Sequence, residues 1–482
     1  MISFFVGLGI LLAGYLLYGR LAGRLLGADA SRATPATTLA DGVDFVPINW
    51  KKAFLIEFLN IAGLGPIFGA ILGATYGPVA FIWIALGAVF IGGIHDYFSG
   101  MLSMRNQGRS IPEIVGQYLG NGFRQFMRAF TVLLMILVGA VFITGPAEIL
   151  AGFWKGQGII SQTVFWASII VVYYIFATLL PIDKIIGRIY PLFGLAMLIM
   201  AVGILAGMMM EGYLVNIPEA VPSHFINMKS NAAANPIFPM LFITIACGAI
   251  SGFHSTQAPL MARCLTNEKY GVRVFYGAMI TEGLVAMIWA AIAMAFFGSV
   301  KGLNEAVAQK NPASIVNEIS LTLLGKFGGL LAILGVVAAP ITSGDTAFRS
   351  ARLIVADFLN LSQKKISHRI IISVPLFIIG VSLTLFKFEI IWRYMAWANQ
   401  TLATIVLWAI TVYLYRERKA YFLAGLPAIF MTTVVTAYIL MAPIGFGLSS
   451  DTALILMGIA TIFITLYFGY FMRRLRPSSL HY

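Results

Sequence analysis

Long apolar stretches separated by short polar segments recur along the chain and predict thirteen membrane-spanning helices. A helix needs about 20 mostly apolar residues to cross the hydrocarbon core of a bilayer, and each stretch approaches that length. The predicted spans are roughly residues 2–19, 53–75, 78–101, 126–151, 160–180, 187–210, 237–263, 273–297, 320–343, 369–387, 391–414, 420–442 and 452–471. No soluble domain fits between them, although the connections 20–52, 211–236 and 298–319 have room for short interfacial helices.

The composition agrees with a multi-pass membrane protein. Hydrophobic residues make up 60% and charged residues 11% of the 482 positions, and the mean hydropathy is +0.89. A soluble fold of this length would need a more polar surface. The net charge of +13 could suggest nucleic acid, but the basic residues cluster in every second connection, as they do in cytoplasmic loops. We therefore expect the N-terminus outside and the C-terminus in the cytoplasm.

Several classes of active site are excluded by missing motifs. There is no GxxxxGK[ST] phosphate loop, so ATP is not expected to drive the protein. No HExxH, CxxC or paired-histidine spacing indicates a metal enzyme, and two cysteines give no disulfide framework. We expect no catalytic residue, no cofactor and no bound metal. The first apolar stretch runs into LLYGRLAGR, which predicts a retained span rather than a cleaved signal peptide.

The second span contains the most informative stretch, EFLNIAGLGPIFGAILGATY, residues 57–76. Its Gly-x-Gly-Pro sequence at 63–66 weakens helical hydrogen bonding in a region where an unpaired backbone group costs several kcal/mol. Such a break is tolerated where it lines a cavity; the alternative is a kinked helix that packs through small residues. Because Glu57 and Asn60 lie about one helical turn apart beside the break, the sequence favours a binding site.

The seventh span has a matching interruption in FITIACGAISGFHSTQAPLMAR, residues 242–263. Gly248, Ser251 and Gly252 fall near mid-depth, and the polar residues 254–257 follow them. The two breaks are five spans apart, so their helices enter the membrane from opposite sides. Two discontinuous helices of opposite polarity are typical of a five-plus-five inverted repeat, the leucine-transporter-like arrangement.

This spacing predicts one transmembrane domain over residues 1–482 with an internal repeat. The first repeat would cover residues 53–210 and the second 237–415. Residues 1–52 would form an additional helix and a cytoplasmic loop, and residues 420–482 two C-terminal helices and a basic tail. The halves share no residue-level similarity, so the repeat is inferred from spacing alone.

Ionisable side chains inside the spans are candidates for ion coupling, because a charge in the bilayer is costly and faces a cavity or a partner. Glu57, Glu282 in span eight and Glu148 near the outer end of span four could each carry a proton. For Glu282 and Glu148 the alternative is a packing carboxylate with a hydrogen-bonded partner. His95 and Asp96 end span three and could relay protons. Adjacent helical residues do not normally face each other, however, and a structural pair near the cytoplasmic interface fits equally well.

Span nine ends in PITSGDTAFRSAR, which gathers hydroxyls and one carboxylate. These groups suit a small hard cation or a gate contact, whereas Asp345 paired with Arg349 would be an ordinary interfacial salt bridge. Asn399 and Gln400, at the start of the buried part of span eleven, could form hydrogen bonds across helices. The predicted ion-coupling residues are Glu57, Glu282, Asp345, Thr342, Ser343, His95 and Asp96. The predicted substrate-binding residues are Asn60, Gly63, Gly65, Gly248, Ser251, Gly252, His254, Ser255, Gln257, Asn399 and Gln400.

Five blocks of the sequence place polar residues within long apolar stretches: DGVDFVPINWKKAFLIEFLNIAGLGPIFGAILGATYGP, GGIHDYFSGMLSMRNQGRSIPE, ITIACGAISGFHSTQAPLMARCLTNE, TSGDTAFRSARLIVAD and WANQTLATI. Together these blocks resemble the carbon starvation protein A family. The chain resembles the shorter members. Longer members carry a histidine pair where Ile56 and Glu57 stand here, so a role of that pair would pass to Glu57 or be absent. The resemblance implies secondary transport of peptides under nutrient limitation, pyruvate uptake in some relatives, and kinship with the amino acid–polyamine–organocation superfamily.

We therefore predict an all-α polytopic protein of the bacterial inner membrane that imports small peptides with protons. The alternatives are a pyruvate or amino-acid symporter driven by protons or sodium ions, and a membrane sensor that binds nutrients without moving them. The expected partners are a small peptide or carboxylate, protons or sodium ions, and membrane lipids, but not nucleic acid. Neither break contains a lysine or arginine for a lone anion, which favours a zwitterion held by helix ends.

Overall fold

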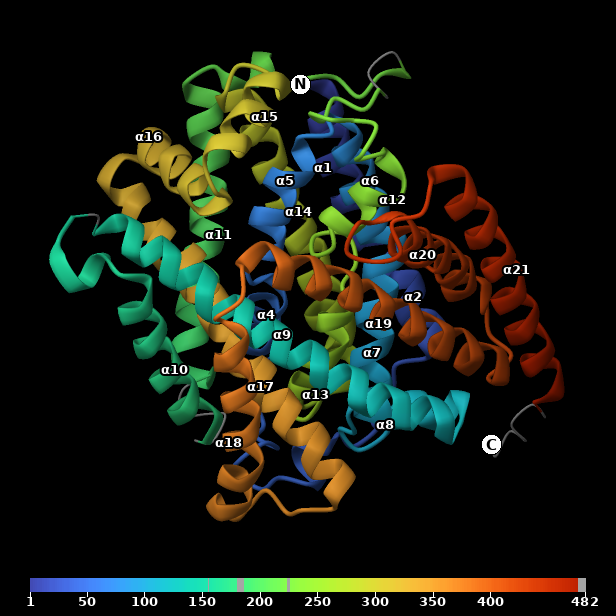
Figure 1. The fold of residues 1–482 in the computed structure, drawn as a ribbon. Helices are drawn as coiled ribbons and strands as arrows, with labels where there is room; N and C mark the ends of the chain where they lie inside the picture. The colour runs from blue at the N-terminus through green and yellow to red at the C-terminus, as the bar shows by residue number, and fades with distance from the viewer. Residues whose placement is uncertain (155, 180–185, 223–225, 476–482) are drawn as a thin grey trace.

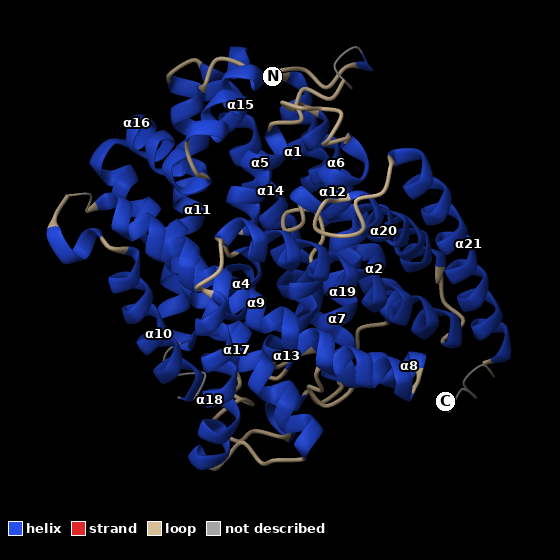
Figure 2. Ribbon diagram, in the orientation of Figure 1, coloured by secondary structure: helices blue, strands red, loops and turns tan. Residues whose placement is uncertain are grey.

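The computed structural model describes residues 1–154, 156–179, 186–222 and 226–475. These residues form helices and loops but no β-strand (Figure 2), and one isolated bridge pairs Ile48 with Leu265. The elements of the first half are α1 (Ile2–Gly14), η1 (Tyr15–Gly19), α2 (Arg20–Leu26), α3 (Pro35–Thr38), α4 (Trp50–Ala62), η2 (Gly65–Gly69), α5 (Ala70–Ala74), α6 (Val79–Leu86), η3 (Gly87–Gly92), α7 (Gly93–Arg105), α8 (Ile111–Leu119), α9 (Asn121–Phe153), η4 (Gly158–Ser161), α10 (Thr163–Leu179), α11 (Ile186–Met210) and η5 (Tyr213–Asn216). Those of the second half are α12 (Ile237–Thr244), α13 (Gly252–Ala262), η7 (Glu268–Tyr270), η8 (Val272–Tyr276), α14 (Gly277–Phe296), α15 (Val300–Gln309), α16 (Pro312–Ala332), η9 (Ile333–Val337), α17 (Ala338–Leu359), α18 (Ile366–Leu383), α19 (Phe388–Arg416), α20 (Phe422–Met441) and α21 (Ser450–Arg474).

Nine helices in the described ranges are long and apolar enough to cross a membrane, or eleven if each of two bent pairs is one span. The bent pairs are α4 with η2–α5, and α16 with η9–α17. Two further apolar elements, α10 and the interrupted pair α12–α13, consist of shorter helices. The all-α multi-pass class is therefore confirmed. The number thirteen, the inverted repeat and the domain boundaries stay predictions.

Two of the predicted span ends are wrong. His95 and Asp96 do not end span three, because its helix continues from Val79 to Arg105 and buries both side chains. The predicted span 320–343 is also displaced, since it straddles the bend between Pro312–Gly329 and Leu334–Leu359, and the second helix continues well past residue 343. The polar residues that suggested the end of this span are buried by neighbouring helices, so their polarity does not mark an interface.

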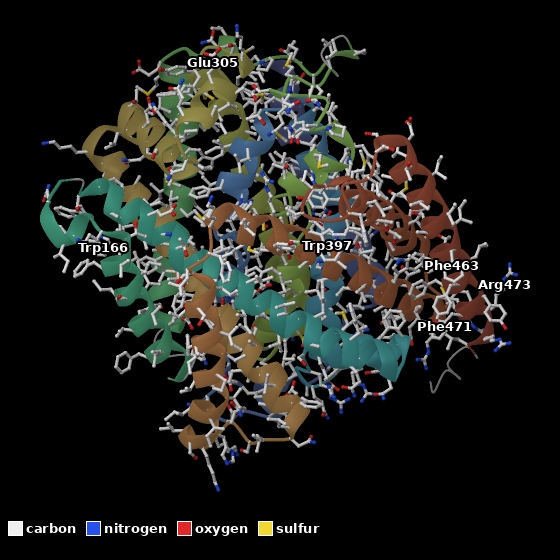
Figure 3. All side chains as sticks on the ribbon, in the orientation of Figure 1. Trp166, Glu305, Trp397, Phe463, Phe471 and Arg473 are labelled. Atoms are coloured by element: carbon white, nitrogen blue, oxygen red, sulfur yellow. The ribbon has the colours of Figure 1, made fainter. Side chains whose placement is uncertain are left out.

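The largely buried helix α14 lies at the centre of the molecule, and α21 lies at one edge (Figure 1). Phe463 on α21, labelled in Figure 3, is 70% exposed, and several other large apolar side chains of this helix are exposed as well. A band of exposed apolar side chains on an outer helix is suited to contact with lipid. Arg473 in the last turn of α21 places a positive charge where the helix would leave the membrane.

Both predicted breaks are confirmed. Helix α4 ends at Ala62 because Gly63 takes a φ of +45°, which other residues rarely adopt, and the helix resumes in η2 with Pro66 in its first turn. The axis bends by 54° between the two parts. In span seven, α12 ends at Thr244 and α13 begins at Gly252, with non-helical residues between them.

The two breaks pack directly on each other through a row of glycines. Gly65, Gly69 and Gly73 are spaced by four residues and therefore share one helical face. A Cβ atom on Gly65 would lie 2.1 Å from Cys247 Cβ, and one on Gly69 would lie 3.1 Å from the carbonyl oxygen of Thr244. Small residues at these positions let the backbones approach closely, as in other membrane helix contacts.

Replacing Gly65 with alanine is expected to destabilise the protein by about 1–3 kcal/mol, because the new methyl group overlaps Cys247. The measurement is thermal unfolding of the purified protein in detergent. Adding Cys247→Gly, which removes the opposing side chain, is expected to restore part of the loss. Gly9→Ala on α1 is the control, since nothing lies within 4 Å of a Cβ there. Equal melting temperatures for Gly65→Ala and Gly9→Ala would contradict the close packing.

Candidate functional site

A histidine held between two carboxylates lies beside the second break. His254, in the first turn of α13, places Nδ1 2.8 Å from Asp96 Oδ2 and Nε2 3.3 Å from Glu282 Oε2. His95 Nδ1 lies 2.7 Å from the other carboxylate oxygen of Asp96. These four residues are at most 1% exposed. They form a continuous series, His95–Asp96–His254–Glu282, which is called the central ionisable chain below.

His95 and Asp96 are neighbours in the sequence, and their side chains are nevertheless hydrogen-bonded to each other. The expectation that neighbouring helical residues face away from each other is wrong here, because the Asp96 carboxylate lies between both imidazoles. A carboxylate can accept hydrogen bonds at both oxygens. Asp96 therefore links α7 to α13 beside the second break, and its carboxylate is buried.

Glu57 and Asn60 on α4 lie next to this chain. Helix α4 packs against α13 and α14, and Glu57 is within electrostatic reach of Asp96 and His254. Both side chains are at most 1% exposed, yet Glu57 Oε2 and both amide atoms of Asn60 have no hydrogen-bond partner in the described structure. Buried polar atoms are nearly always paired. The unpaired atoms therefore mark a place where a polar ligand would be stabilised.

Two amides from α19 hold the non-helical part of span seven. Asn399 Oδ1 accepts a hydrogen bond from the backbone N–H of Phe253 at 2.5 Å, and its Nδ2 donates to Ser251 Oγ at 2.8 Å. Gln400 Nε2 donates to the carbonyl oxygen of Ile250 at 2.9 Å. Asn399 thus supplies the N-terminal cap of α13 from another helix. The structure brings both predicted amides to the break.

Cys247, His254 and Glu282 offer a thiol, an imidazole and a carboxylate whose ligand atoms lie within 4.8 Å of one another. This spacing alone would permit a metal ion. Both nitrogens of His254, however, already face carboxylates, Asp96 at 2.8 Å and Glu282 at 3.3 Å. Nδ1 of His254 is hydrogen-bonded to Asp96, whereas its Nε2 and both Glu282 oxygens have no hydrogen-bond partner in the described structure. The absence of a metal therefore stays a prediction.

The remaining polar residues of α13 bond within their helix or toward α17. Ser255 Oγ donates to the carbonyl oxygen of Gly252 at 2.7 Å. Gln257 Nε2 lies 2.9 Å from Thr256 Oγ1 and 3.5 Å from Ser350 Oγ on α17. Ser255 thus bonds within its own helix, whereas Gln257 Oε1 is buried without a hydrogen-bond partner in the described structure.

The predicted polar residues of α17, Thr342, Ser343 and Asp345, have different hydrogen-bond partners. Ser343 Oγ donates to the carbonyl oxygen of Leu59 at 3.1 Å, which brings Ser343 to the first break. Thr342 Oγ1 donates to a carbonyl of its own helix at 2.7 Å. Asp345 accepts hydrogen bonds from the hydroxyls of Tyr190 and Tyr173. Ser343 is thus hydrogen-bonded to α4 next to the first break.

A buried ion cluster closes the face on which the basic loops lie. Asp44, in the segment just before α4, is 2% exposed and lies 3.3 Å from Arg349 Nη1 and 3.5 Å from Arg352 Nη2. Burial alone would raise the pKa of the Asp44 carboxyl, but the charges of Arg352 and Arg349 outweigh it and hold that pKa below its ordinary value. Arg349 therefore pairs with Asp44, which lies 305 positions away in the sequence, and not with Asp345 as the helical spacing predicted.

Residues 41–49, which we call the strap, attach to the end of α13 as well. The backbone N–H of Ile48 donates to the carbonyl oxygen of Cys264 at 2.9 Å, and Cys264 Sγ lies 3.8 Å from the carbonyl oxygen of Asp44. The guanidinium of Arg263 lies 5.2 Å from the ring centroid of Phe45. The strap thus connects α4, α13 and α17 beneath the two breaks.

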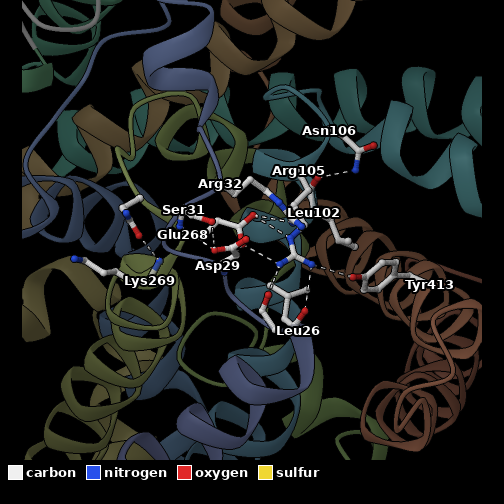
Figure 4. A network of polar contacts seen from close by, with 12 residues as sticks. Leu26, Asp29, Ser31, Arg32, Leu102, Arg105, Asn106, Glu268, Lys269 and Tyr413 are labelled. Atoms are coloured by element: carbon white, nitrogen blue, oxygen red, sulfur yellow. Dashed lines mark hydrogen bonds and ion pairs between the residues drawn. The ribbon is translucent and has the colours of Figure 1, made fainter. Parts of the chain in front are cut away.

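A second polar network covers the same face (Figure 4). Arg105 at the end of α7 forms two bonds with Glu268, Nε to Oε1 at 3.0 Å and Nη2 to Oε2 at 2.9 Å, and donates to the carbonyl oxygens of Leu26 and Gly27. Arg32 Nη1 lies 3.2 Å from Glu268 Oε1. Paired bonds between a guanidinium and a carboxylate are among the strongest polar contacts. The network fixes the end of α2 against α7 and η7.

Comparison with known proteins was made for both sequence and structure. The family model of carbon starvation protein CstA matches residues 1–153 and 143–323. An uncharacterized membrane protein of Haemophilus influenzae is 41% identical, with 64% of this chain and 94% of the relative covered. A peptide transporter CstA of Campylobacter jejuni is 31% identical (58% and 48% covered), and the pyruvate/proton symporter BtsT of Escherichia coli is 26% identical (57% and 46% covered).

The chain thus spans about half the length of the two relatives whose names state a function. Among solved structures, MhsT in complex with L-phenylalanine is similar, with a TM-score of 0.55, 14% identity, and 86% of this chain and 98% of that chain covered. At this identity the similarity concerns the fold. It agrees with the leucine-transporter-like class predicted from the two breaks.

Proposed function

Because this chain belongs to the carbon starvation protein CstA family, we propose that it is a secondary active importer of small peptides that is coupled to protons. The observation that carries the proposal is the central ionisable chain at the point where the two interrupted spans meet. Ionisable groups inside a membrane are costly and usually mark the path of an ion or a substrate. Interrupted helices add free backbone groups that can bind the charged ends of a substrate.

The substrate class follows from the charges available at the breaks. Residues 59–70 and 244–254 contain no lysine or arginine, so a lone carboxylate would have no permanent positive charge beside it. A peptide is a zwitterion, and its carboxylate could use the N-terminal N–H groups of α13 while its ammonium uses the carbonyls that end α4. The unpaired amide of Asn60 adds a donor and an acceptor. The Campylobacter jejuni relative, named a peptide transporter, supports this assignment.

Coupling would arise from the number of protons on the central ionisable chain. Glu57, Asp96 and Glu282 would carry three negative charges if all were ionised, against two imidazoles that are each neutral or positive. Such a buried excess of charge favours uptake of a cation or a proton before substrate crosses the membrane. Sodium is the alternative, and the name of the pyruvate/proton symporter BtsT favours protons.

Pyruvate is the second candidate substrate, because the Escherichia coli relative is named for it. A peptide importer and a pyruvate importer differ in one measurement. Proteoliposomes that contain the purified protein should accumulate a labelled dipeptide when the outside is acidic, and should do so less with a sodium gradient at equal pH. Accumulation of pyruvate without dipeptide would assign the second function. No uptake of either solute under either gradient would contradict transport and favour a sensor.

A further inference from the structure

A charged cavity lies above the first break, on the face predicted to be outside. Its volume is about 620 Å³, within the range of small-molecule binding pockets. It is lined by η2 and α5, by α9, by the end of α15 and the start of α16, and by the first turns of α19. Helices α5 and α15 lie toward the end of the molecule that carries the N-terminus (Figure 1). We call this cavity the outer vestibule.

Opposite charges line the outer vestibule. Arg393 on α19 is exposed and forms no hydrogen bond or ion pair with any residue in the described ranges. Glu148 on α9 lines the same cavity. Lys310 also lines it, but its ammonium is paired with Glu318 at 2.7 Å. Burial, followed by the charge of Arg393, lowers the pKa of nearby Lys229 to about 8. Since Arg393 has no partner of its own in the described ranges, its guanidinium favours a bound anion.

Aromatic rings form the part of the vestibule next to the break. Phe388 and Trp392 stack with their centroids 5.6 Å apart, and Trp392 lies 6.5 Å from Phe68. Phe68 belongs to η2, the segment that carries Gly65 against Cys247. The vestibule therefore borders η2, the segment that follows the first break.

We propose that the outer vestibule is a first binding site for zwitterionic peptides, with Arg393 binding the carboxylate and Glu148 the ammonium. The aromatic rings of Phe68, Phe388 and Trp392 contact the side chains of the peptide and tolerate different ones, because flat apolar surfaces impose little geometry. The proposal rests on the proposed peptide function. It adds a step in which the vestibule selects peptides that carry a charge at both ends. A substrate that lacks either charge loses one of the two contacts.

The test uses uptake kinetics of the full chain in proteoliposomes with alanyl-alanine, its C-terminal amide and its N-acetyl form. For Arg393→Gln, KM for alanyl-alanine is expected to rise about tenfold, as for loss of one charge-assisted contact, while the maximal rate changes less than twofold. The variant should also lose the preference for free acid over amide. Glu148→Gln should instead lose the preference for the free amine over the N-acetyl form.

Lys301→Gln on α15 removes an exposed positive charge outside the vestibule and is expected to leave KM unchanged. Wild-type protein that takes up no dipeptide would overturn the proposed function. Wild-type uptake with an unchanged KM and unchanged preference in Arg393→Gln would overturn the vestibule alone. If Arg393→Gln does not reach the membrane, Glu148→Gln decides the question from a different helix, and retained discrimination against the N-acetyl form would refute the site.

Discussion

Replacing Glu282 with glutamine is expected to abolish accumulation of substrate against its gradient while exchange of internal for external substrate continues. Glutamine keeps the size of the side chain but can no longer gain or lose a proton. Its partner His254 stays bound to Asp96 at 2.8 Å, so the histidine keeps its position. Uptake driven by an acidic exterior should therefore stop when the internal and external concentrations are equal.

The measurement compares acid-driven accumulation with counterflow in the same proteoliposomes. Glu305→Gln is the control, because this glutamate is exposed on α15, whereas Glu282 is fully buried. Normal accumulation in Glu282→Gln would remove Glu282 from coupling. Glu57→Gln is the informative companion: the sequence assigned the coupling role to Glu57 as readily as to Glu282, but only Glu282 contacts His254. If Glu57→Gln loses accumulation and Glu282→Gln keeps it, then Glu57 and not Glu282 carries the coupled proton.

The sequence located both breaks because glycine, proline and polar residues are conspicuous in an apolar span. It also showed that Glu57, Asn60 and Glu282 lie in spans, where an ionisable or amide group needs a reason. The row of Gly65, Gly69 and Gly73 could have been read as a packing face from its four-residue spacing. The sequence could not show that Cys247 lies opposite Gly65, since the fold brings the two together.

Contacts between distant segments were beyond the reach of sequence patterns. Hydropathy identified Asp345 as polar in an apolar region but could not reveal that tyrosines 155 and 172 positions away would bind it. The helical rule that pairs Asp345 with Arg349 considers one helix only. Arg349 instead contacts Asp44, which lies in the connection before α4. A local rule describes which contacts are permitted, and tertiary packing decides between them.

Asp44→Asn is expected to open the predicted cytoplasmic side and expose Cys264. The native carboxylate lies between two arginines that are at most 1% exposed, and removal of one partner from a buried ion pair costs about 3–5 kcal/mol. States in which the strap leaves α17 let the arginines reach water, so they become relatively favourable. If about 3 kcal/mol acts on this equilibrium, the open population rises by roughly 100-fold.

Cys264 reports the change directly, because its thiol is fully buried under the strap and the chain has only one other cysteine. The experiment follows labelling of Cys264 by a membrane-impermeant maleimide in inside-out vesicles, with each cysteine peptide quantified by mass spectrometry. Asp29→Asn changes the same charge at an exposed position of the same connection and should label as slowly as the native chain. Simple unfolding would label Cys247 and Cys264 together from either side of the membrane.

Faster labelling of Cys264 alone, from the predicted cytoplasmic side alone, would identify the strap as the inner gate. Labelling of Asp44→Asn at the rate of Asp29→Asn would show that the arginines do not hold it closed.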